Sequence, residues 1–262
     1  MSILRVALIQ LDVALGQPNL NLHRVAEMIT RASAEGATLV VLPELWATGY
    51  DLENIACHAT HLSEGLWPEI RALAERHHVF IYGSLVELRE SRAFNTAALI
   101  APTGQIMATY SKLHLFGLMD ETKYLSPGAS PVLTDTPWGK TGLSICYDLR
   151  FPELYRRYAI NGAQVFLICA EWPKRRIEHW RTLLRARAIE NQCIVIACNC
   201  VGANKGENFG GHSALISAWG ETCVEGGETA DLILAEVDPN CVTEARERIR
   251  VFADRRVDVY GG

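Results

Sequence analysis

Apolar residues recur along this chain in two alternating patterns: short continuous runs, and longer runs with helical spacing. The runs Ile3–Leu11 and Thr38–Glu44 predict buried strands. Between them, Asn19–Gly36 has apolar residues spaced along one helical face and ends at a glycine. Strands that alternate with helices in this way are typical of α/β proteins, in which helices cover the faces of a sheet.

The same patterns continue to the end of the chain. Further strands are predicted at Val79–Leu88, Phe94–Pro102, Gln105–Lys112, Gly142–Ile145, Gln164–Ile168, Cys193–Cys200, His212–Ser217 and Leu232–Val237. Further helices are predicted at Leu66–His78, Pro152–Asn161, Ile177–Asn191 and from Pro239 onward. The polar stretch Gly117–Pro137 and the glycine-rich stretch Gly206–Gly211 are predicted to be loops. No linker divides the chain, so we expect one domain over residues 1–262.

Composition and charge narrow the class of protein. The 262 residues are 49% hydrophobic and 21% charged, with a net charge of −5, which does not favour nucleic-acid binding. The amino terminus lacks the pattern of a signal peptide, and no apolar run reaches the roughly 18 residues of a membrane span. We therefore expect a cytoplasmic protein, and we expect the eight cysteines to stay reduced, without a disulfide framework.

Three chemically reactive residues stand at the ends of predicted strands. Glu44 follows the strand "LVVLP", Lys112 follows "QIMATYS", and Cys146 follows "GLSI" just before the helix that begins at Pro152. The ends of strands in α/β sheets are where reacting groups emerge. A carboxylate there can serve as a general base, a lysine can stabilise an oxyanion, and a cysteine can act as a nucleophile.

Each of these residues also has an ordinary structural interpretation when it is considered alone. Cys146 would pack as a small apolar residue, Glu44 would cap a helix or form an ion pair, and Lys112 would be a solvated charge. The coincidence of all three at strand ends favours the catalytic interpretation.

The three segments that carry these residues resemble the nitrilase superfamily of carbon–nitrogen hydrolases. They are "VVLPELWATGY", "YSKLHLFGLMDETKYLSPG" and "LSICYDLRFPELYRRYAINGAQ", in that order, and the similarity runs from Leu4 to about Val237. This resemblance implies an α/β fold of four layers, an αββα sandwich, with a catalytic triad of Glu44, Lys112 and Cys146. It also implies a supporting glutamate, which by position before the "SPG" at Ser126 is Glu121.

The resemblance also implies a mechanism that makes chemical sense for these residue types. Glu44 takes the proton of Cys146, and the sulfur attacks an amide carbonyl. Lys112 and the backbone N–H of Tyr147 hold the oxyanion, ammonia leaves, and water hydrolyses the thioester. We expect no metal and no organic cofactor, and the partners are a small amide substrate and water.

The residues after the cysteine point to one branch of the superfamily. "CYDLRFPELYR" and "EWPKRRIEHWRTLLRARAIENQ" resemble ω-amidases and related Nit-type amidases, which act on the terminal amide of 2-oxoglutaramate and similar 2-oxo-acid amides. A nitrilase, a deaminated-glutathione amidase, an N-carbamoyl amide hydrolase and a non-catalytic member of the fold remain alternatives. The family resemblance further suggests a homodimer or a higher homo-oligomer.

A carboxylated substrate requires a cationic or N–H-rich binding site. Arg175 is a candidate, as are its neighbours Lys174 and Arg176 and the more distant Arg150, although for each of them taken alone a surface charge is the favoured interpretation. Trp172 is a candidate for an apolar wall of the pocket, with structural packing as its alternative.

Cys198, Cys200 and His212 have two interpretations, a metal site and core packing. Cys198 and Cys200 lie two residues apart on one face of a predicted strand, with His212 further along the chain. This is not the usual spacing of metal ligands, so core packing is favoured.

Overall fold

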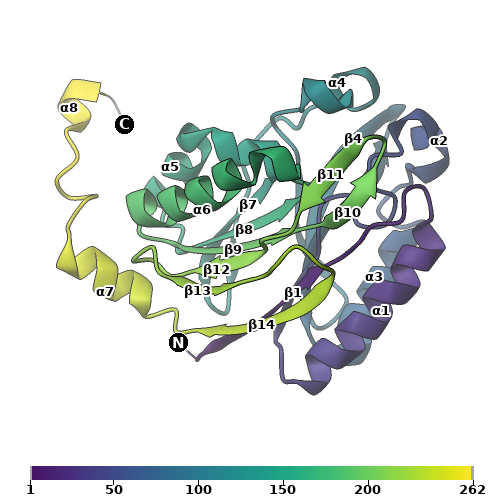
Figure 1. Cartoon of the computed structure of the whole chain (residues 1–262). Coiled ribbons are helices and arrows are strands. Elements are labelled where there is room, and N and C mark those ends of the chain that lie inside the picture. Colours follow the sequence, from purple (N-terminus) through teal and green to yellow (C-terminus); the bar gives the residue numbers. More distant parts are fainter. Residues whose placement is uncertain (1, 261–262) are drawn as a thin grey trace.

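Two six-stranded sheets lie face to face at the centre of the protein (Figure 1). The computed structural model describes residues 2–260. The first sheet has the order β14 (Asp231–Val237), β1 (Leu4–Gln10), β2 (Leu39–Val41), β3 (Phe80–Arg89), β4 (Arg92–Ile100), β5 (Ile106–Ser111). The second has the order β13 (Thr222–Glu225), β12 (Ala214–Ile216), β9 (Ile194–Asn199), β8 (Val165–Ala170), β7 (Gly139–Ile145), β6 (Leu133–Thr136).

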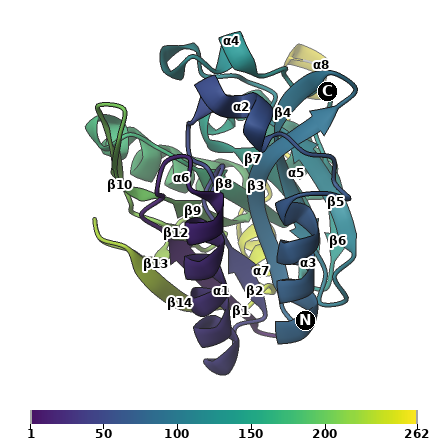
Figure 2. The ribbon, with the colours of Figure 1, turned by 90° about the vertical axis from the view of Figure 1, so that its right-hand side faces the viewer.

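Helices cover the outer face of each sheet, as the two views of the ribbon show (Figures 1 and 2). The first sheet is covered by α1 (Pro18–Ala34) and α3 (Leu66–His77), and the second by α5 (Pro152–Ile160) and α6 (Ile177–Asn191). Short helices α2 (Ile55–His58), α4 (Glu121–Tyr124), α7 (Cys241–Arg248) and α8 (Val257–Tyr260) complete the set. The molecule is therefore the α/β four-layer αββα sandwich that the sequence predicted.

The alternation of side chains along each strand explains why both faces of a sheet are buried. In the first sheet, Leu8 and Val41 belong to the core cluster shared with the second sheet, whereas Ile9 and Val40 pack with α1 and α3. The two sheets are also joined directly, because the hydroxyl of Tyr82 donates to the carbonyl of Ser144 at 2.9 Å.

Strand direction brings four chain segments to one edge of the sandwich. In the first sheet β1, β2 and β3 are parallel, and β5 is antiparallel to β4 and so runs with them. In the second sheet β7, β8 and β9 are parallel. The carboxyl ends of β2, β5, β7 and β8 therefore present Glu44, Lys112, Cys146 and Glu171.

Some polar segments are more ordered than their composition predicted. The stretch Gly117–Pro137 contains α4 and the strand β6, and Gly206–Gly211 overlaps a hairpin of β10 (Val201–Asn204) and β11 (Glu207–Gly210). The strand β13 was not predicted either. These strands lie at sheet edges or outside the two main sheets, where burial imposes little apolar pattern.

Within residues 2–260, no helix combines the length and the apolar character that a membrane crossing requires.

Candidate active site

Glu44 lies just beyond the end of β2 with its side chain completely buried. Its Oε1 accepts hydrogen bonds from Asn95 Nδ2 at 2.7 Å and from the Tyr50 hydroxyl at 3.0 Å. Its Oε2 accepts the backbone N–H of Glu171 at 2.9 Å. These three donors, from three separate segments, hold the carboxylate in a fixed orientation.

The chain turns sharply at both Glu44 and Cys146. Leu45, directly after Glu44, has a φ of +41°, and its N–H donates to Ser84 Oγ at 2.8 Å. Cys146 itself has a φ of +45°, at the start of the short 3₁₀ turn Cys146–Arg150. The left-handed region is unfavourable for side chains other than glycine, and residues held there often mark functional sites.

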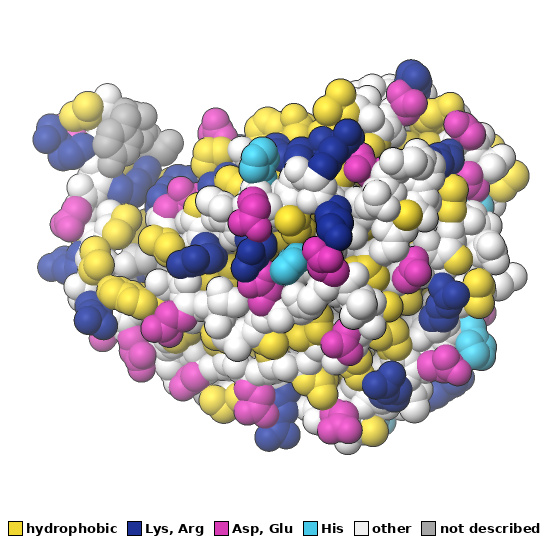
Figure 3. All heavy atoms as spheres, viewed as in Figure 1, with side chains coloured by type: hydrophobic (Ala, Val, Ile, Leu, Met, Phe, Trp, Pro, Cys, Tyr) yellow, Lys and Arg dark blue, Asp and Glu magenta, His cyan; other side chains and the backbone are white. Residues whose placement is uncertain are grey.

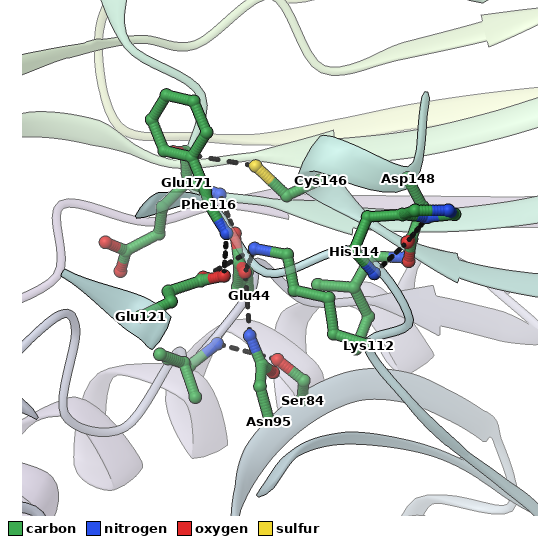
Figure 4. A network of polar contacts seen from close by, with 12 residues as sticks. Glu44, Ser84, Asn95, Lys112, His114, Phe116, Glu121, Cys146, Asp148 and Glu171 are labelled. Carbon is green, nitrogen blue, oxygen red and sulfur yellow. Dashed lines mark hydrogen bonds and ion pairs between the residues drawn. The ribbon is translucent and has the colours of Figure 1, made fainter. Parts of the chain in front are cut away.

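Lys112 joins Glu44 to a second buried carboxylate. Its Nζ lies 2.7 Å from Glu44 Oε1 and 2.5 Å from Glu121 Oε1. The Tyr50 hydroxyl also donates to Glu121 Oε1, at 2.5 Å, and the backbone N–H of Phe116 donates to Glu121 Oε2 at 2.6 Å. Lys112, Glu44 and Glu121 have no exposed surface, so one ammonium group bridges two desolvated carboxylates (Figure 4).

The sulfur of Cys146 lies beside this cluster. Figure 4 shows Sγ on the side of the Lys112 amino group and the Glu44 carboxylate, and its hydrogen-bond acceptor is the carbonyl of Glu171 at 3.9 Å. Burial raises the pKa of the thiol well above its ordinary value, and the negative charge of Glu44 adds to this, whereas Lys112 opposes it. The thiol is therefore protonated at rest and needs a base at the moment of attack.

The charges of the cluster follow from its burial and its ion pairs. Burial lowers the pKa of Lys112, but Glu121 and Glu44 raise it by more, so the pKa lies well above its ordinary value and the lysine stays protonated. Burial raises the pKa of Glu121, although Lys112 acts in the opposite direction. The cluster thus combines a permanent positive charge with carboxyl groups that can exchange protons.

Glu171 contributes to the site through its backbone, and its side chain is unusual for a glutamate because it is buried without a partner. Its carboxyl group is completely buried, and neither oxygen has a hydrogen-bond partner among the described residues. Burial raises the pKa of Glu171 well above its ordinary value, and the nearby charge of Glu44 raises it further. We infer that this carboxyl group is neutral in the folded protein.

Asp148 anchors the turn that carries Cys146, a role that no pattern in the sequence indicates. Its completely buried carboxylate accepts the N–H of Ile145 at 3.0 Å and the Tyr110 hydroxyl at 2.7 Å. It also accepts the N–H of His114 at 3.0 Å and lies 2.7 Å from His114 Nδ1. The His114 ring stacks on Phe151, with 3.6 Å between ring centroids. His114 therefore orients the loop after Lys112.

Two arginines each lie over an aromatic ring. The Arg176 guanidinium lies 5.2 Å from the centre of the Phe116 ring, and the Arg150 guanidinium lies 4.7 Å from the Trp172 ring. Arg176 Nη2 is buried without a hydrogen-bond partner among the described residues. Burial lowers the pKa of Arg176 and the positive charge of Arg175 lowers it further, whereas the carboxylate of Glu207 raises it.

The structure also places the remaining sequence candidates. Trp172 is buried, with its indole N–H bound to the carbonyl of Arg176 at 2.8 Å, and Tyr147 packs 4.9 Å from Phe116 between ring centroids. Arg175 is exposed and forms an ion pair with Glu207 at 2.6 Å. It lines a cavity of about 310 Å³ that Tyr50 also lines. Arg175 therefore lies beside the cavity at Tyr50, whereas Arg176 lies over the Phe116 ring.

Among residues 2–260, no group of histidine, cysteine and acidic side chains is arranged to hold a metal ion. The Cys198 thiol donates to the carbonyl of Ile9 at 3.2 Å, and Cys200 is buried in the core cluster beneath α1. His212 Nδ1 lies 2.6 Å from Glu225 Oε1. All eight cysteines are free thiols. Core packing thus accounts for Cys198 and Cys200.

Comparison with known proteins agrees with this geometry. The family model for carbon–nitrogen hydrolases matches residues 5–247. The chain is 42% identical to the 2-oxoglutaramate amidase of Bacillus subtilis over 97% of this chain and 98% of that protein.

Two solved structures show the same likeness in three dimensions. A carbon–nitrogen hydrolase superfamily protein of Xanthomonas campestris, with an arsenic adduct in its active site, has a TM-score of 0.90 and 29% identity over 97% of this chain and 98% of that one. A mutant amidase from Nesterenkonia sp. AN1, with the acetamide moiety of fluoroacetamide added covalently at the active-site cysteine, has a TM-score of 0.85 and 26% identity over 98% of this chain and 95% of that one.

The four-layer fold, the matched family model and the extended sequence identity assign the chain to the carbon–nitrogen hydrolase family, within the nitrilase superfamily. The chain is an amide-hydrolysing enzyme of that family.

Proposed function

We propose that this protein is a thiol amidohydrolase of the ω-amidase type, built as one domain over residues 1–262. It would release ammonia from the terminal amide of a small carboxylated substrate such as 2-oxoglutaramate. The observation that carries this proposal is the position of the Lys112 ammonium group, 2.7 Å from Glu44 and 2.5 Å from Glu121, beside the Cys146 thiol.

Acylation begins with a proton transfer. Glu44 takes the proton of the Cys146 thiol as the sulfur attacks the amide carbon, and the carbonyl oxygen becomes an oxyanion. The Lys112 ammonium group and the backbone N–H of Tyr147 stabilise that oxyanion. Glu44 then gives its proton to the leaving nitrogen, the C–N bond breaks, and ammonia departs from a thioester on Cys146.

Deacylation uses the same carboxylate. Glu44 takes a proton from water, the oxygen attacks the thioester, and a second oxyanion forms in the same position. When it collapses, the C–S bond breaks, the sulfur recovers its proton from Glu44, and the carboxylic acid product leaves. Glu121 supports both halves of the cycle, because it holds Lys112 in place at 2.5 Å.

Arg176 and Arg150 are proposed to bind the carboxylate at the far end of the substrate. The buried Nη2 of Arg176 has no hydrogen-bond partner among the described residues, and a guanidinium group matches the geometry of a carboxylate. Trp172, which stacks under Arg150, would form an apolar wall of the pocket. The name of the Bacillus subtilis relative, a 2-oxoglutaramate amidase, supports a substrate of this kind.

Two further features belong to this proposal. We propose a cytoplasmic location, which the eight free thiols support because thiols persist in reducing compartments. We also propose a homodimer or a higher homo-oligomer. The exposed apolar side chains of Ile189 and Trp219, which are 52% and 41% accessible, support a contact between copies.

An ammonia-release panel tests the proposed substrate class. It compares 2-oxoglutaramate, a simple ω-amide without the 2-oxo group, deaminated glutathione, a nitrile and an N-carbamoyl compound. We expect the highest kcat/KM for 2-oxoglutaramate. A clear preference for the nitrile, or turnover of none of the amides, would contradict the proposal.

A further inference from the structure

A second cavity lies apart from the active site, beside the carboxyl-terminal segment. It has a volume of about 480 Å³. Its lining comes from the end of α5, the end of α6, α7 and the residues that follow α7, and it includes Ile160, Gln192, Arg246, Arg250, Phe252 and Arg255. Figure 3 shows Lys and Arg side chains interspersed with acidic and apolar ones over α7 and the segment beyond it.

The lining of this cavity is positively charged. Arg246, Arg250 and Arg255 contribute three guanidinium groups, and the described lining contains no carboxylate. A fourth arginine, Arg156, stands next to it, because the guanidinium groups of Arg156 and Arg246 lie 5.5 and 5.0 Å from the centre of the Phe252 ring. This concentration of positive charge contrasts with the net charge of −5 of the whole chain.

Several of these cations lack an anionic partner. Arg246 Nη2 donates to the carbonyl of Ala163, and Arg156 Nη2 to the carbonyl of Glu190, each at 2.6 Å. However, Arg246 Nε and Arg156 Nη1 are buried without any acceptor among the described residues. Across residues 2–260, Arg250 and Arg255 form no ion pair.

Binding to the ends of helices accounts for only part of this arrangement. The helices α5, α6 and α7 all end near the cavity, and arginines bind the carbonyl groups of helix ends favourably. The bonds of Arg156 and Arg246 to carbonyl groups fit that role. The buried Arg246 Nε and Arg156 Nη1 do not, because a buried charged donor without an acceptor is costly. The exposed Arg250 and the partly buried Arg255 add two further positive charges beside them.

We propose that this cavity binds a small molecule with an oxyanion group of at least two negative charges, held by Arg246, Arg250 and Arg255. Guanidinium groups bind phosphate and carboxylate oxygens in pairs. The cavity volume falls in the range of small-molecule sites, and Phe252 and Ile160 offer contact to an apolar part of the ligand. This site does not depend on the proposed amidase function.

Ligand-dependent thermal unfolding and calorimetric titration of the full chain test the proposal. The probes are inorganic phosphate and succinate, which distinguish a phosphate from a dicarboxylate, and sodium chloride at matched ionic strength is the control. We expect one of the two oxyanions to raise Tm in a saturable way, with one site per chain, because a ligand that binds only the folded state stabilises it. An equal shift with chloride, or no shift with either oxyanion, would overturn the proposal.

Variants locate the site. In Arg250→Ala/Arg255→Ala we expect at least about tenfold weaker binding, from the loss of charge-assisted hydrogen bonds. Arg248→Ala removes one positive charge from the end of α7 without touching the cavity lining and should bind like the wild type. Two results would contradict the site: unchanged binding in the double variant, or binding lost in Arg176→Ala, which would place the anion in the active site.

Light scattering of the same variants separates the proposal from a contact between copies. We expect an unchanged oligomeric mass in Arg250→Ala/Arg255→Ala. A different outcome would overturn the proposal: the wild type binds neither oxyanion, and the double variant loses oligomeric mass. These arginines would then face a second copy of the chain instead.

Discussion

The ammonium group of Lys112 lies 2.7 Å from the carboxylate of Glu44, and both side chains are completely buried. These two residues are 68 positions apart in the chain and come from the ends of β5 and β2. A pair buried this deeply is costly to desolvate, so its stability depends on the further hydrogen bonds from Asn95 and Tyr50 and on the second carboxylate of Glu121.

Removal of the lysine should therefore destabilise the fold as well as abolish activity. In Lys112→Met, two carboxylates lose their shared cation, and we expect a loss of about 3–5 kcal/mol in the free energy of unfolding. Adding Glu121→Gln removes one of the two stranded charges and should recover part of that loss. Chemical denaturation of the single and double variants measures both effects. A Lys112→Met protein as stable as the wild type would contradict the buried ion pair.

Replacement of the base should separate catalysis from folding. Glu44→Gln keeps the size of the side chain and loses the ability to take a proton from Cys146, so we expect kcat to fall by about 10²- to 10⁴-fold. The folded state should persist, which circular dichroism checks. Activity within a few fold of the wild type would show that another group accepts the thiol proton.

Two neighbouring arginines offer a matched test of substrate binding. Arg176→Ala should raise KM for a carboxylated amide by about 10- to 100-fold, because a charge-assisted hydrogen bond is lost. A neutral amide of the same length should be much less affected. Arg175→Ala is the control, because Arg175 is exposed and already paired with Glu207. Equal effects of the two variants, or equal effects on both substrates, would contradict the proposed role of Arg176.

The neutral carboxyl group of Glu171 predicts a pH dependence of stability. Burial raises the pKa of Glu171 in the folded state, whereas in the unfolded chain a glutamate has a pKa of about 4.3. The folded state therefore holds this proton more tightly. The resulting contribution to the free energy of unfolding is complete below about pH 4.3. As pH rises above that value, the contribution declines by at most about 1.4 kcal/mol per pH unit. The decline ends once the pH has passed the pKa of Glu171 in the folded state.

Glu171→Gln should remove this decline. Relative to the wild type, the variant should gain stability as pH rises above about 4.3, the pKa of an unfolded glutamate, while the exposed Glu153→Gln should not. Denaturation at several pH values measures the difference. Parallel stability curves for Glu171→Gln and the wild type would show that Glu171 has an ordinary pKa in the folded protein.

The layered fold and the three strand-end residues could be predicted from the sequence. Short, largely apolar runs such as Ile3–Leu11 favour buried strands, and the segments around Glu44, Lys112 and Cys146 carry a specific family resemblance. In parallel strands, shared direction alone then brings such strand ends to one edge.

The roles of the supporting residues could not be predicted from the sequence, because they depend on contacts between distant segments. Asn95 lies within an apolar strand and reaches Glu44 across the sheet, and Asp148 ties the turn of Cys146 to Tyr110 and His114. No periodicity signals either role. Likewise, only the local 3₁₀ turn Lys174–Arg176 decides that Arg176, rather than its neighbour Arg175, stacks on Phe116.

Ammonia release by Cys146→Ala tests the central claim most directly. The account predicts a folded protein whose release of ammonia from 2-oxoglutaramate falls to the background rate, because no thioester can form. A folded Cys146→Ala protein that retains a rate comparable to the wild type would contradict the assignment of Cys146 as the nucleophile.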